Sequence, residues 1–289
     1  MKKVITVFVL AGVLASCGTT KKNSTSENNQ TEIKEVKMTN KEKARAFVKA
    51  LSSQDEAAIK ALTSEEIIQH NPFFPTGLEV IIKHALPALK TAGTSGEVIR
   101  VIEDGGFVVM HNHWTNASPF GGDELVAFDI YRFNKDGKIA EHWDALQPLV
   151  KETASGRTQT DGSTVVEDLD KTEANKALAV SLIEDVLMGK DPSKIGDYIS
   201  SEEYHQHNPQ IKDGLTGIVE AVEYLTSQNN MFKYTKIHKV LGEGNFVLTV
   251  SEGEWNGGKK HAFYDLFRLN EGKIVEHWDV IQEIPTEGL

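Results

Sequence analysis

Two carboxylates and an imidazole recur in the same short pattern near the end of each half of the sequence. In both halves the histidine and one aspartate belong to the segment Glu-His-Trp-Asp, and the second aspartate precedes that segment by about one strand. A carboxylate beside a histidine can abstract a proton next to a carbonyl when burial raises its pKa. The alternative is a structural cross-strand pair that satisfies half-buried polar groups. The candidate catalytic residues are Asp144, His142 and Asp129 in the first half and Asp279, His277 and Asp265 in the second.

A hairpin is expected to bring each triplet together. The glycines at 137 and 272 separate two strand-like runs in each half. We expect a three-residue loop ending at Gly272 and a loop one residue longer in the first half, so that Asp265 pairs with His277 and Asp129 with His142. Because strand side chains alternate with a period of two, the triplet shares one face, and the Trp, Glu and Arg of the same motifs lie on the other as packing residues and ion pairs.

Other polar residues are candidates for ligand contacts. His-Asn-Pro occurs in both halves at the end of a helical region, where its Asn either binds the backbone in a turn or lies with its His at a pocket mouth. His111 and His113 share a strand face, and with His142 they suggest a metal site. The second half offers Val250 and Glu252 near those positions, so we predict no metal and no cofactor. The candidate substrate-binding residues are His70, Asn71, His207, Asn208, His111 and His113.

Three matched blocks indicate a duplication. The His-Asn-Pro loop, an Asp-x-x-Arg strand and the Gly-Lys-Ile-x-Glu-His-Trp-Asp segment recur at almost constant spacing. We expect two domains, the first repeat at residues 39–150 and the second repeat at residues 171–285, joined by a Thr-, Ser-, Gly- and Asp-rich linker at 151–170. Helical patterning precedes strand patterning in each repeat, which predicts an α+β fold. In the first repeat we expect helices over 40–51, 54–62 and 78–89 and strands over 96–103, 107–114, 124–133 and 138–149.

The N-terminus predicts export. Residues 1–16 combine two lysines, a short apolar run and small residues, as a secretory signal does. Leu-Ala-Ser-Cys resembles a lipobox, and Cys17, the only cysteine, would be the lipidated residue. Residues 17–38 are polar and predict a solvated tether. We therefore expect a protein of the cell envelope, attached to the membrane through the lipid on Cys17 only. The formal net charge of −11 argues against nucleic acid as a partner.

The motifs together resemble the SnoaL-like polyketide cyclase family, in its branch of predicted aldol-condensation enzymes. The resemblance is carried by the strand around Asp129, the Glu-His-Trp-Asp segments, the His-Asn-Pro loops and residues 107–113. It implies two tandem nuclear transport factor 2-like domains, each a cone of N-terminal helices packed on a curved antiparallel sheet around an apolar pocket. It also implies sheet-to-sheet docking of the two domains as an intramolecular pseudo-dimer. The activity implied is cofactor-free, with Asp144 and Asp279 as the acid/base.

Two functions stay open at this point. One is a cofactor-independent cyclase, isomerase or lyase/dehydratase acting on a small carbonyl compound. The other is a non-catalytic small-molecule-binding or accessory periplasmic lipoprotein. The sequence contains no P-loop, dinucleotide fingerprint or nucleophilic-serine elbow. Catalysis requires an acid/base aspartate that faces an enclosed cavity, and we expect the more complete pocket in the first repeat because of His111 and His113.

Overall fold

The computed structural model describes residues 37–286. The expected signal segment at 1–16, Cys17 and nearly all of the expected tether lie outside the described residues. No helix within residues 37–286 is long and apolar enough to cross a membrane.

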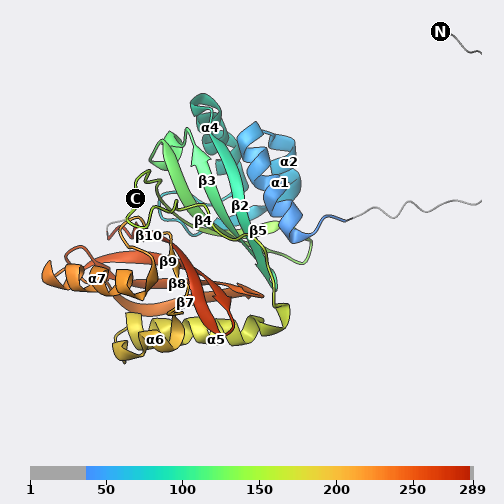
Figure 1. Ribbon diagram of the computed structural model, residues 1–289. Coiled ribbons are helices and arrows are strands. Elements are labelled where there is room, and N and C mark those ends of the chain that lie inside the picture. The colour runs from blue at the N-terminus through green and yellow to red at the C-terminus, as the bar shows by residue number, and fades with distance from the viewer. Residues whose placement is uncertain (1–36, 287–289) are drawn as a thin grey trace, which may run out of the picture. The chain divides into compact units, whose positions relative to one another are not determined.

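The first repeat consists of helices followed by a five-stranded sheet (Figure 1). Helix α1 begins with a capping box, in which the Thr39 hydroxyl accepts from the Glu42 N–H and the Glu42 carboxylate accepts from the Thr39 N–H. The strand order is β1-β5-β4-β3-β2. The elements are α1 (Asn40–Ser53), α2 (Glu56–Leu62), β1 (Thr63–Gln69), α3 (Leu78–Val80), the π-helical turn η1 (Ile81–Ala85), α4 (Leu86–Ala92), β2 (Ser95–Asp104), β3 (Phe107–Thr115), the 3₁₀ turn η2 (Ser118–Phe120), β4 (Glu124–Phe133) and β5 (Ile139–Pro148).

The second repeat has the same order of strands, β6-β10-β9-β8-β7. In both sheets the first strand is parallel to its neighbour and the other pairs are antiparallel. Its elements are η3 (Leu169–Lys171), α5 (Thr172–Leu182), the π-helical turn η4 (Ile183–Leu187), η5 (Pro192–Lys194), α6 (Ile195–Tyr198), β6 (His205–Gln206), α7 (Gly214–Ser227), β7 (Lys233–Glu243), β8 (Phe246–Trp255), β9 (Lys259–Asn270) and β10 (Lys273–Glu283). The expected α+β fold, with helices on a sheet in each of two tandem units, is confirmed.

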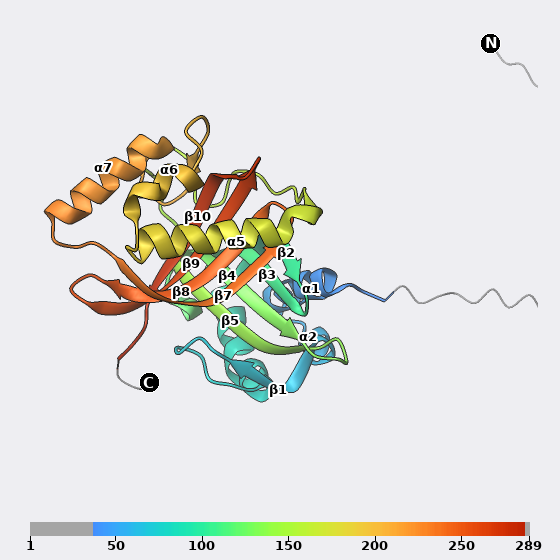
Figure 2. The ribbon, with the colours of Figure 1, turned by 90° about the horizontal axis from the view of Figure 1, so that it is seen from below.

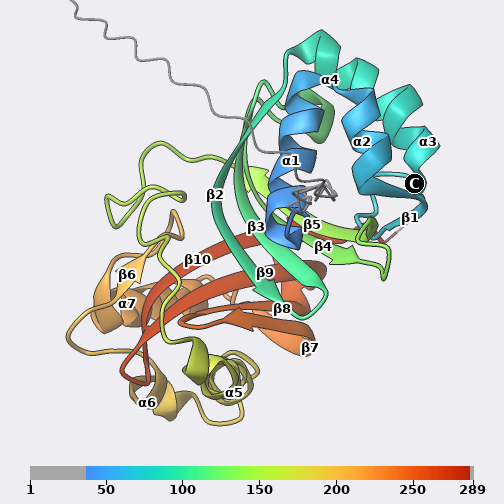
Figure 3. The ribbon, with the colours of Figure 1, turned by 90° about the vertical axis from the view of Figure 1, so that its right-hand side faces the viewer.

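Each sheet has an inner face covered by its own helices and an outer face packed against the other sheet (Figure 3). Along β4, Ala127 and Tyr131 enter the inner core with α1, whereas Phe128 and Ile130 enter a cluster that contains residues of both sheets. This division follows from the alternation of strand side chains. Helix α5 runs along the inner face of the second sheet (Figure 2). Side chains of one strand therefore serve two different environments.

The hairpin register differs from the expected one by two residues. In the second repeat the turn contains only Glu271 and Gly272, both with positive φ (48° and 75°), as a two-residue type I′ turn requires. A bulge between Ile274 and Glu276 shifts the pairing by one more residue, and Asp265 lies opposite Asp279. A bulge does the same in the first repeat, where Asp129 lies opposite Asp144. Because the total shift is even, the triplets keep the face that was expected.

The segment between the repeats is ordered and packed. It contains no helix or strand from Leu149 to Asp168, as expected for a linker, but it makes specific contacts with both repeats. Gln159 is 2% exposed, and its side-chain carbonyl accepts from the Val150 N–H at 2.7 Å. The Arg157 guanidinium binds the Asp213 carboxylate at 2.8 Å. Composition predicted a loop but could not predict these contacts, because they depend on the packing of the two sheets.

Candidate functional site

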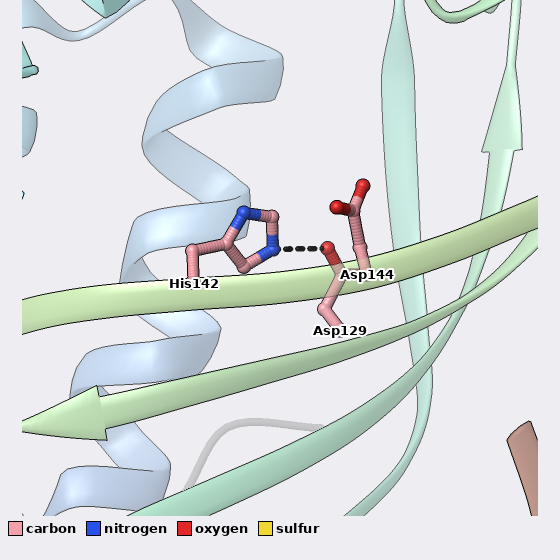
Figure 4. Close-up of side chains that lie close together, drawn as sticks. All are labelled: Asp129, His142 and Asp144. Atoms are coloured by element: carbon pink, nitrogen blue, oxygen red, sulfur yellow. Dashed lines mark hydrogen bonds and ion pairs between the residues drawn. The ribbon is translucent and has the colours of Figure 1, made fainter. Parts of the chain in front are cut away.

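The first triplet lies on the inner face of the β4–β5 hairpin (Figure 4). Nε2–H of His142 donates to Oδ1 of Asp129 at 2.9 Å. Asp144 lies directly opposite Asp129 across the hairpin. The two carboxylates and the imidazole therefore converge, as the sequence predicted, although the cross-strand partners are Asp129 and Asp144 rather than Asp129 and His142.

Neighbouring polar groups fix the Asp129–His142 pair. The Asn112 amide donates to Asp129 at 2.6 Å, and the Tyr131 hydroxyl donates to the same carboxylate at 3.4 Å. The Gln69 amide donates to Nδ1 of His142 at 2.8 Å, while the Gln69 carbonyl accepts from the Asn71 N–H at 3.0 Å. Asp129 is thus fully engaged, and its role is to hold the imidazole in place.

Asp144 is the uncommitted member of the triplet. Its Oδ1 is buried and has no hydrogen-bond partner among the described residues. Burial, together with the charge of Asp129, raises its pKa to about 6, although the neighbouring His142 and Asn71 lower it. Burial lowers the pKa of His142, but the charge of Asp144 and the bond to Asp129 outweigh it, so that this pKa is raised overall. A carboxylate with a free oxygen and a pKa near neutrality suits a general base.

Asp144, His142 and Asp129 open onto a cavity of about 280 Å³ inside the first repeat. Its wall is largely apolar, and the polar groups gather at the triplet, where Tyr131 and Gln69 also contribute. This combination of an apolar wall with a few convergent polar groups is typical of small-molecule sites. The apolar side chains of the wall include Phe47, Leu51, Ile67, Phe74, Leu89, Trp114, Phe120 and Leu146.

The second triplet has similar bonds but no comparable opening. Nε2–H of His277 donates to Asp265 at 3.1 Å, and the Asn208 amide donates to Asp279 at 2.6 Å. Asp265, His277 and Asp279 are 2%, 8% and 7% exposed. The cavity found in this repeat, of about 450 Å³ beside α7, is lined by Asn208 and Ile281 but by none of the triplet. Burial again raises the pKa of Asp279.

The two histidines of the His-Asn-Pro loops do not lie at a pocket mouth, and that expectation was wrong. His70 stacks on Trp143 with a centroid distance of 4.2 Å, and His207 stacks on Trp278 at 4.6 Å. Each bonds the Glu of its own Glu-His-Trp-Asp segment, on the outer side of the sheet. The strand pairing of these loops with β5 and β10 turns the histidine outward and the preceding glutamine inward.

The asparagines of these loops bind the backbone in a turn, as the first interpretation predicted. Oδ1 of Asn71 accepts from the Phe73 N–H at 2.8 Å, and Oδ1 of Asn208 accepts from the Gln210 N–H at 2.9 Å, so each stabilises a turn. The amide nitrogens face the acid/base aspartates: Asn208 bonds Asp279, and Asn71 lies beside Asp144 and lowers its pKa. Asn71 is buried and its amide nitrogen has no partner in residues 37–286.

His111 and His113 do not line the cavity either. They point to the outer face, opposite to His142, so the three histidines cannot share a metal. His111 is buried between the repeats, where its Nδ1 accepts from the Arg100 guanidinium at 3.0 Å. Burial and the neighbouring Arg100 lower its pKa well below the usual value. The cavity is in the first repeat, as expected, but the histidines that motivated the expectation are elsewhere.

Each triplet has the geometry to hold a metal ion. In both repeats one potential ligand atom from each of the three side chains lies within 4.8 Å of the others. Two carboxylate oxygens and an imidazole are common ligands of divalent metals. The prediction that no metal is needed stays a prediction, and treatment with a chelator can test it.

Sequence reasoning missed the polar residues that surround the triplet. Gln69 and Gln206 precede His-Asn-Pro in both repeats, so this duplication was a usable signal. Strand β1, which carries Gln69, was not expected, because it pairs with β5, a segment about 70 residues away in the sequence. No sequence signal marked Tyr131 and Asn112, because their bonds to Asp129 depend on which side chains the folded sheet brings together.

The family comparison concerns the first repeat. Residues 44–142 match the family model of the SnoaL-like domain. The SnoaL-like match thus covers α1 through most of the site, including Gln69, Asp129 and His142, and ends two residues before Asp144. A search of curated proteins returned no significant match.

Several solved structures resemble about one repeat of the chain. An NTF2-like protein of unknown function from Cytophaga hutchinsonii is 18% identical, covers 39% of this chain and 95% of its own, and has a TM-score of 0.33. A SnoaL-like protein from Burkholderia thailandensis is 15% identical, with 36% and 90% covered and a TM-score of 0.32. An LEH-like epoxide hydrolase from M. tuberculosis is 16% identical, with 37% and 82% covered and a TM-score of 0.31. Likeness at this level says nothing about substrate.

Proposed function

We propose that the first repeat catalyses proton transfer at a carbon next to the carbonyl of a small, mainly apolar compound, without a cofactor. The observation that carries this proposal is the free oxygen of Asp144 in the wall of the apolar cavity, with a pKa of about 6. The reaction class is that of a cyclase, isomerase or lyase/dehydratase. The match to the SnoaL-like domain supports the same class.

The geometry suggests how the residues divide the work. Oδ1 of Asp144 takes the proton, the C–H electron pair moves into the new carbon–carbon double bond, and charge develops on the carbonyl oxygen. The Asp129–His142 pair and the Tyr131 hydroxyl line the same cavity. The bond from this hydroxyl to Asp129 is long, at 3.4 Å, and the hydroxyl can turn to donate to the charged oxygen. In an isomerisation, Asp144 then returns the proton to a different atom of the substrate. In a ring closure, the enolate carbon first bonds a second carbonyl carbon, the C=O electron pair moves to its oxygen, and Asp144 returns the proton to that alkoxide.

The size and wall of the cavity limit the substrate. A volume of about 280 Å³ lined by aromatic and aliphatic side chains fits a compact apolar molecule with one polar end. The only acidic groups in the wall belong to the triplet, and a carboxylated substrate would place its charge beside them. We therefore propose a neutral carbonyl compound.

The test combines proton exchange with substitution. A panel of small ketones and esters is incubated with the protein in D₂O, and loss of the α-proton signal is followed by NMR. Asp144→Asn should abolish exchange, whereas Asp279→Asn, in the closed second triplet, should retain it. Exchange that survives Asp144→Asn, or that depends on Asp279 instead, would overturn the assignment.

A second proposal concerns the second repeat. Its triplet is closed, and its cavity beside α7 contains none of the acid/base residues. We propose that this repeat supports the first and binds a ligand without turning it over. Saturable binding that persists in Asp144→Asn and is lost on Phe232→Ala, in the wall of that cavity, is the expected result.

Export and lipid attachment belong to the proposal as well, on the sequence alone. The chain would be cut before Cys17 and attached to a membrane of the cell envelope by a lipid on that residue, with the ordered repeats held outside the cytoplasm. Labelled palmitate should be incorporated by the wild type and not by Cys17→Ser.

A further inference from the structure

The tryptophan of each Glu-His-Trp-Asp segment lies in the same kind of sandwich. Trp143 is stacked on His70 of its own repeat, and Nζ of Lys239 from the other repeat lies 4.0 Å from its ring centroid. Trp278 is stacked on His207, and the Arg100 guanidinium of the other repeat lies 4.1 Å from its ring. The two assemblies are thus matched residue by residue across the interface of the sheets.

The glutamates of the two Glu-His-Trp-Asp segments also have matching hydrogen-bond partners. Glu141 accepts from His70 at 2.8 Å and from Nε of Arg132 at 2.6 Å. Glu276 accepts from His207 at 3.0 Å and from Nε of Arg268 at 2.6 Å. Each assembly therefore contains one Trp, one His, one Glu, one Arg and one cation from the opposite repeat.

Within residues 37–286, a peptide segment covers the assembly at Trp278 and not the one at Trp143. The Trp278 indole N–H donates to the Asp161 carbonyl at 3.0 Å. Nδ1 of His207 lies 2.7 Å from the Thr158 carbonyl and 2.8 Å from the Asp161 carboxylate. The Arg100 guanidinium donates to the carbonyls of Thr160, Asp161 and Ser163.

A glycine allows this segment to lie flat on the ring. Gly162 has a φ of +92°, and a Cβ there would collide with the Glu276 carboxylate and the Trp278 ring. With the segment in place, Trp278 and His207 are each 1% exposed. The linker therefore acts as a built-in extended ligand of this assembly, bound through its backbone carbonyls and one carboxylate.

The matched donors at Trp143 have no partner in residues 37–286. No hydrogen bond involves the Trp143 indole N–H, Nδ1 of His70 or the Lys239 ammonium, and the His70 side chain is 36% exposed. The balance of positive and negative charge also differs between the two assemblies. At Trp278, Arg100 and Arg268 are balanced by Glu276 and Asp161, whereas at Trp143 the cations Lys239 and Arg132 face Glu141 alone. The assembly at Trp143 thus carries two open donors, the Trp143 indole N–H and the Lys239 ammonium, and one uncompensated positive charge. It also carries the open Nδ1 of His70, which donates when the imidazole is protonated.

We propose that the assembly at Trp143 is a binding site for an extended peptide segment of a partner protein that carries an aspartate followed by glycine. The segment would repeat the contacts that Thr158–Ser163 makes at Trp278. Its carbonyls would accept from Trp143 and Lys239, and its carboxylate would accept from Nδ1–H of the protonated His70. The site lies on the outer face of the first sheet, opposite the cavity, so it is independent of the proposed catalysis.

The linker itself supplies the probe. An acetylated, amidated peptide with the sequence of residues 157–164, Arg-Thr-Gln-Thr-Asp-Gly-Ser-Thr, is titrated into the full chain by isothermal calorimetry. Trp143→Phe keeps a ring and removes the indole N–H, and His70→Phe keeps a ring against Trp143 and removes both imidazole nitrogens. Trp255→Phe is the matched control, because the Trp255 indole donates to Asn230 in the second repeat, far from the site in sequence and fold.

Saturable binding with one site is expected. Trp143→Phe and His70→Phe should each weaken it by about 3- to 10-fold, as the loss of one hydrogen bond does, and Trp255→Phe should leave it unchanged. A peptide with asparagine in place of the aspartate, or alanine in place of the glycine, should bind more weakly. Absence of binding at millimolar peptide, equal binding by Trp143→Phe, or equal binding by N-acetylaspartate alone would overturn the proposal.

Discussion

Replacing Asp144 by Asn should remove activity and at the same time stabilise the protein at neutral pH. The pKa of Asp144 is raised from 3.8 to about 6, mainly by burial. In the unfolded chain the carboxyl loses its proton at lower pH than in the folded chain, so stability falls as the pH rises from about 4 to 6. At about 1.4 kcal/mol per pKa unit, the charged carboxylate costs about 3 kcal/mol above pH 6.

The asparagine avoids most of this cost. It keeps the shape of the side chain and carries no charge, and its carbonyl oxygen can face the Asn71 amide beside it. Because the charge of Asp144 supports the raised pKa of His142, part of the gain is lost when this partner disappears. We expect a net gain of about 1–3 kcal/mol at pH 7.5, and at about 2–4 °C per kcal/mol a rise in Tm of several degrees.

Thermal and urea unfolding at pH 7.5 and pH 4 measure this effect. Glu65→Gln is the matched control, since it makes the same change in net charge at an exposed position. The gain of Asp144→Asn should be present at pH 7.5 and nearly vanish at pH 4, where the wild-type carboxyl is largely protonated in the folded state. Lower stability at pH 7.5, or an equal gain at both pH values or in Glu65→Gln, would refute the argument.

Three further predictions follow from the same contacts. The proton-exchange rate should rise with pH through about 6, as Asp144 loses its proton; a rate that is flat from pH 5 to 7 would contradict its role as the base. Trp278→Ala should lower the free energy of unfolding by about 3–5 kcal/mol, and Trp143→Ala by less, because Trp143 is only partly buried and loses less apolar contact. Denaturant titration measures both losses, and equal losses would contradict this prediction. Ala88→Trp, at an exposed position of the cavity wall, should raise KM while changing stability by less than about 0.5 kcal/mol, and an unchanged KM would place the substrate elsewhere.

The sequence predicted most elements of the first repeat because its patterns are local. The helices at α1 and α2 and the four long strands follow from apolar periodicity and caps, and their bounds lie within two residues of expectation. Strand β1 and the bulges of the hairpins were missed, since each depends on contacts between segments distant in sequence. The triplet was located because an even shift in register leaves side-chain faces unchanged.

The sequence did not show which residues of the Glu-His-Trp-Asp segment face a cavity and which face the other repeat. All four residues recur in both repeats, and the histidines of the neighbouring loops recur with them. Only the packing of the two sheets shows that His142 and Asp144 face the cavity, whereas Glu141 and Trp143 face the other repeat. For the same reason His70, His207, His111 and His113 were assigned to a ligand pocket, although they lie on the outer faces.

The residues of the Glu-His-Trp-Asp segment point to two different faces of the sheet. This explains why the second repeat retains the segment although its triplet is closed. Glu276 and Trp278 are needed at the interface, where they hold His207, Arg268 and the linker. His277 and Asp265 are a buried pair joined across the hairpin, and removing either partner would take one hydrogen bond from the other. Asp279 accepts from the Asn208 amide, whose carbonyl holds the turn of its loop. Each of these residues therefore has a structural reason to be present that does not involve a substrate. The recurrence of a catalytic pattern in two repeats is then no evidence for two active sites, and the cavity beside Asp144 is the feature that separates the repeats.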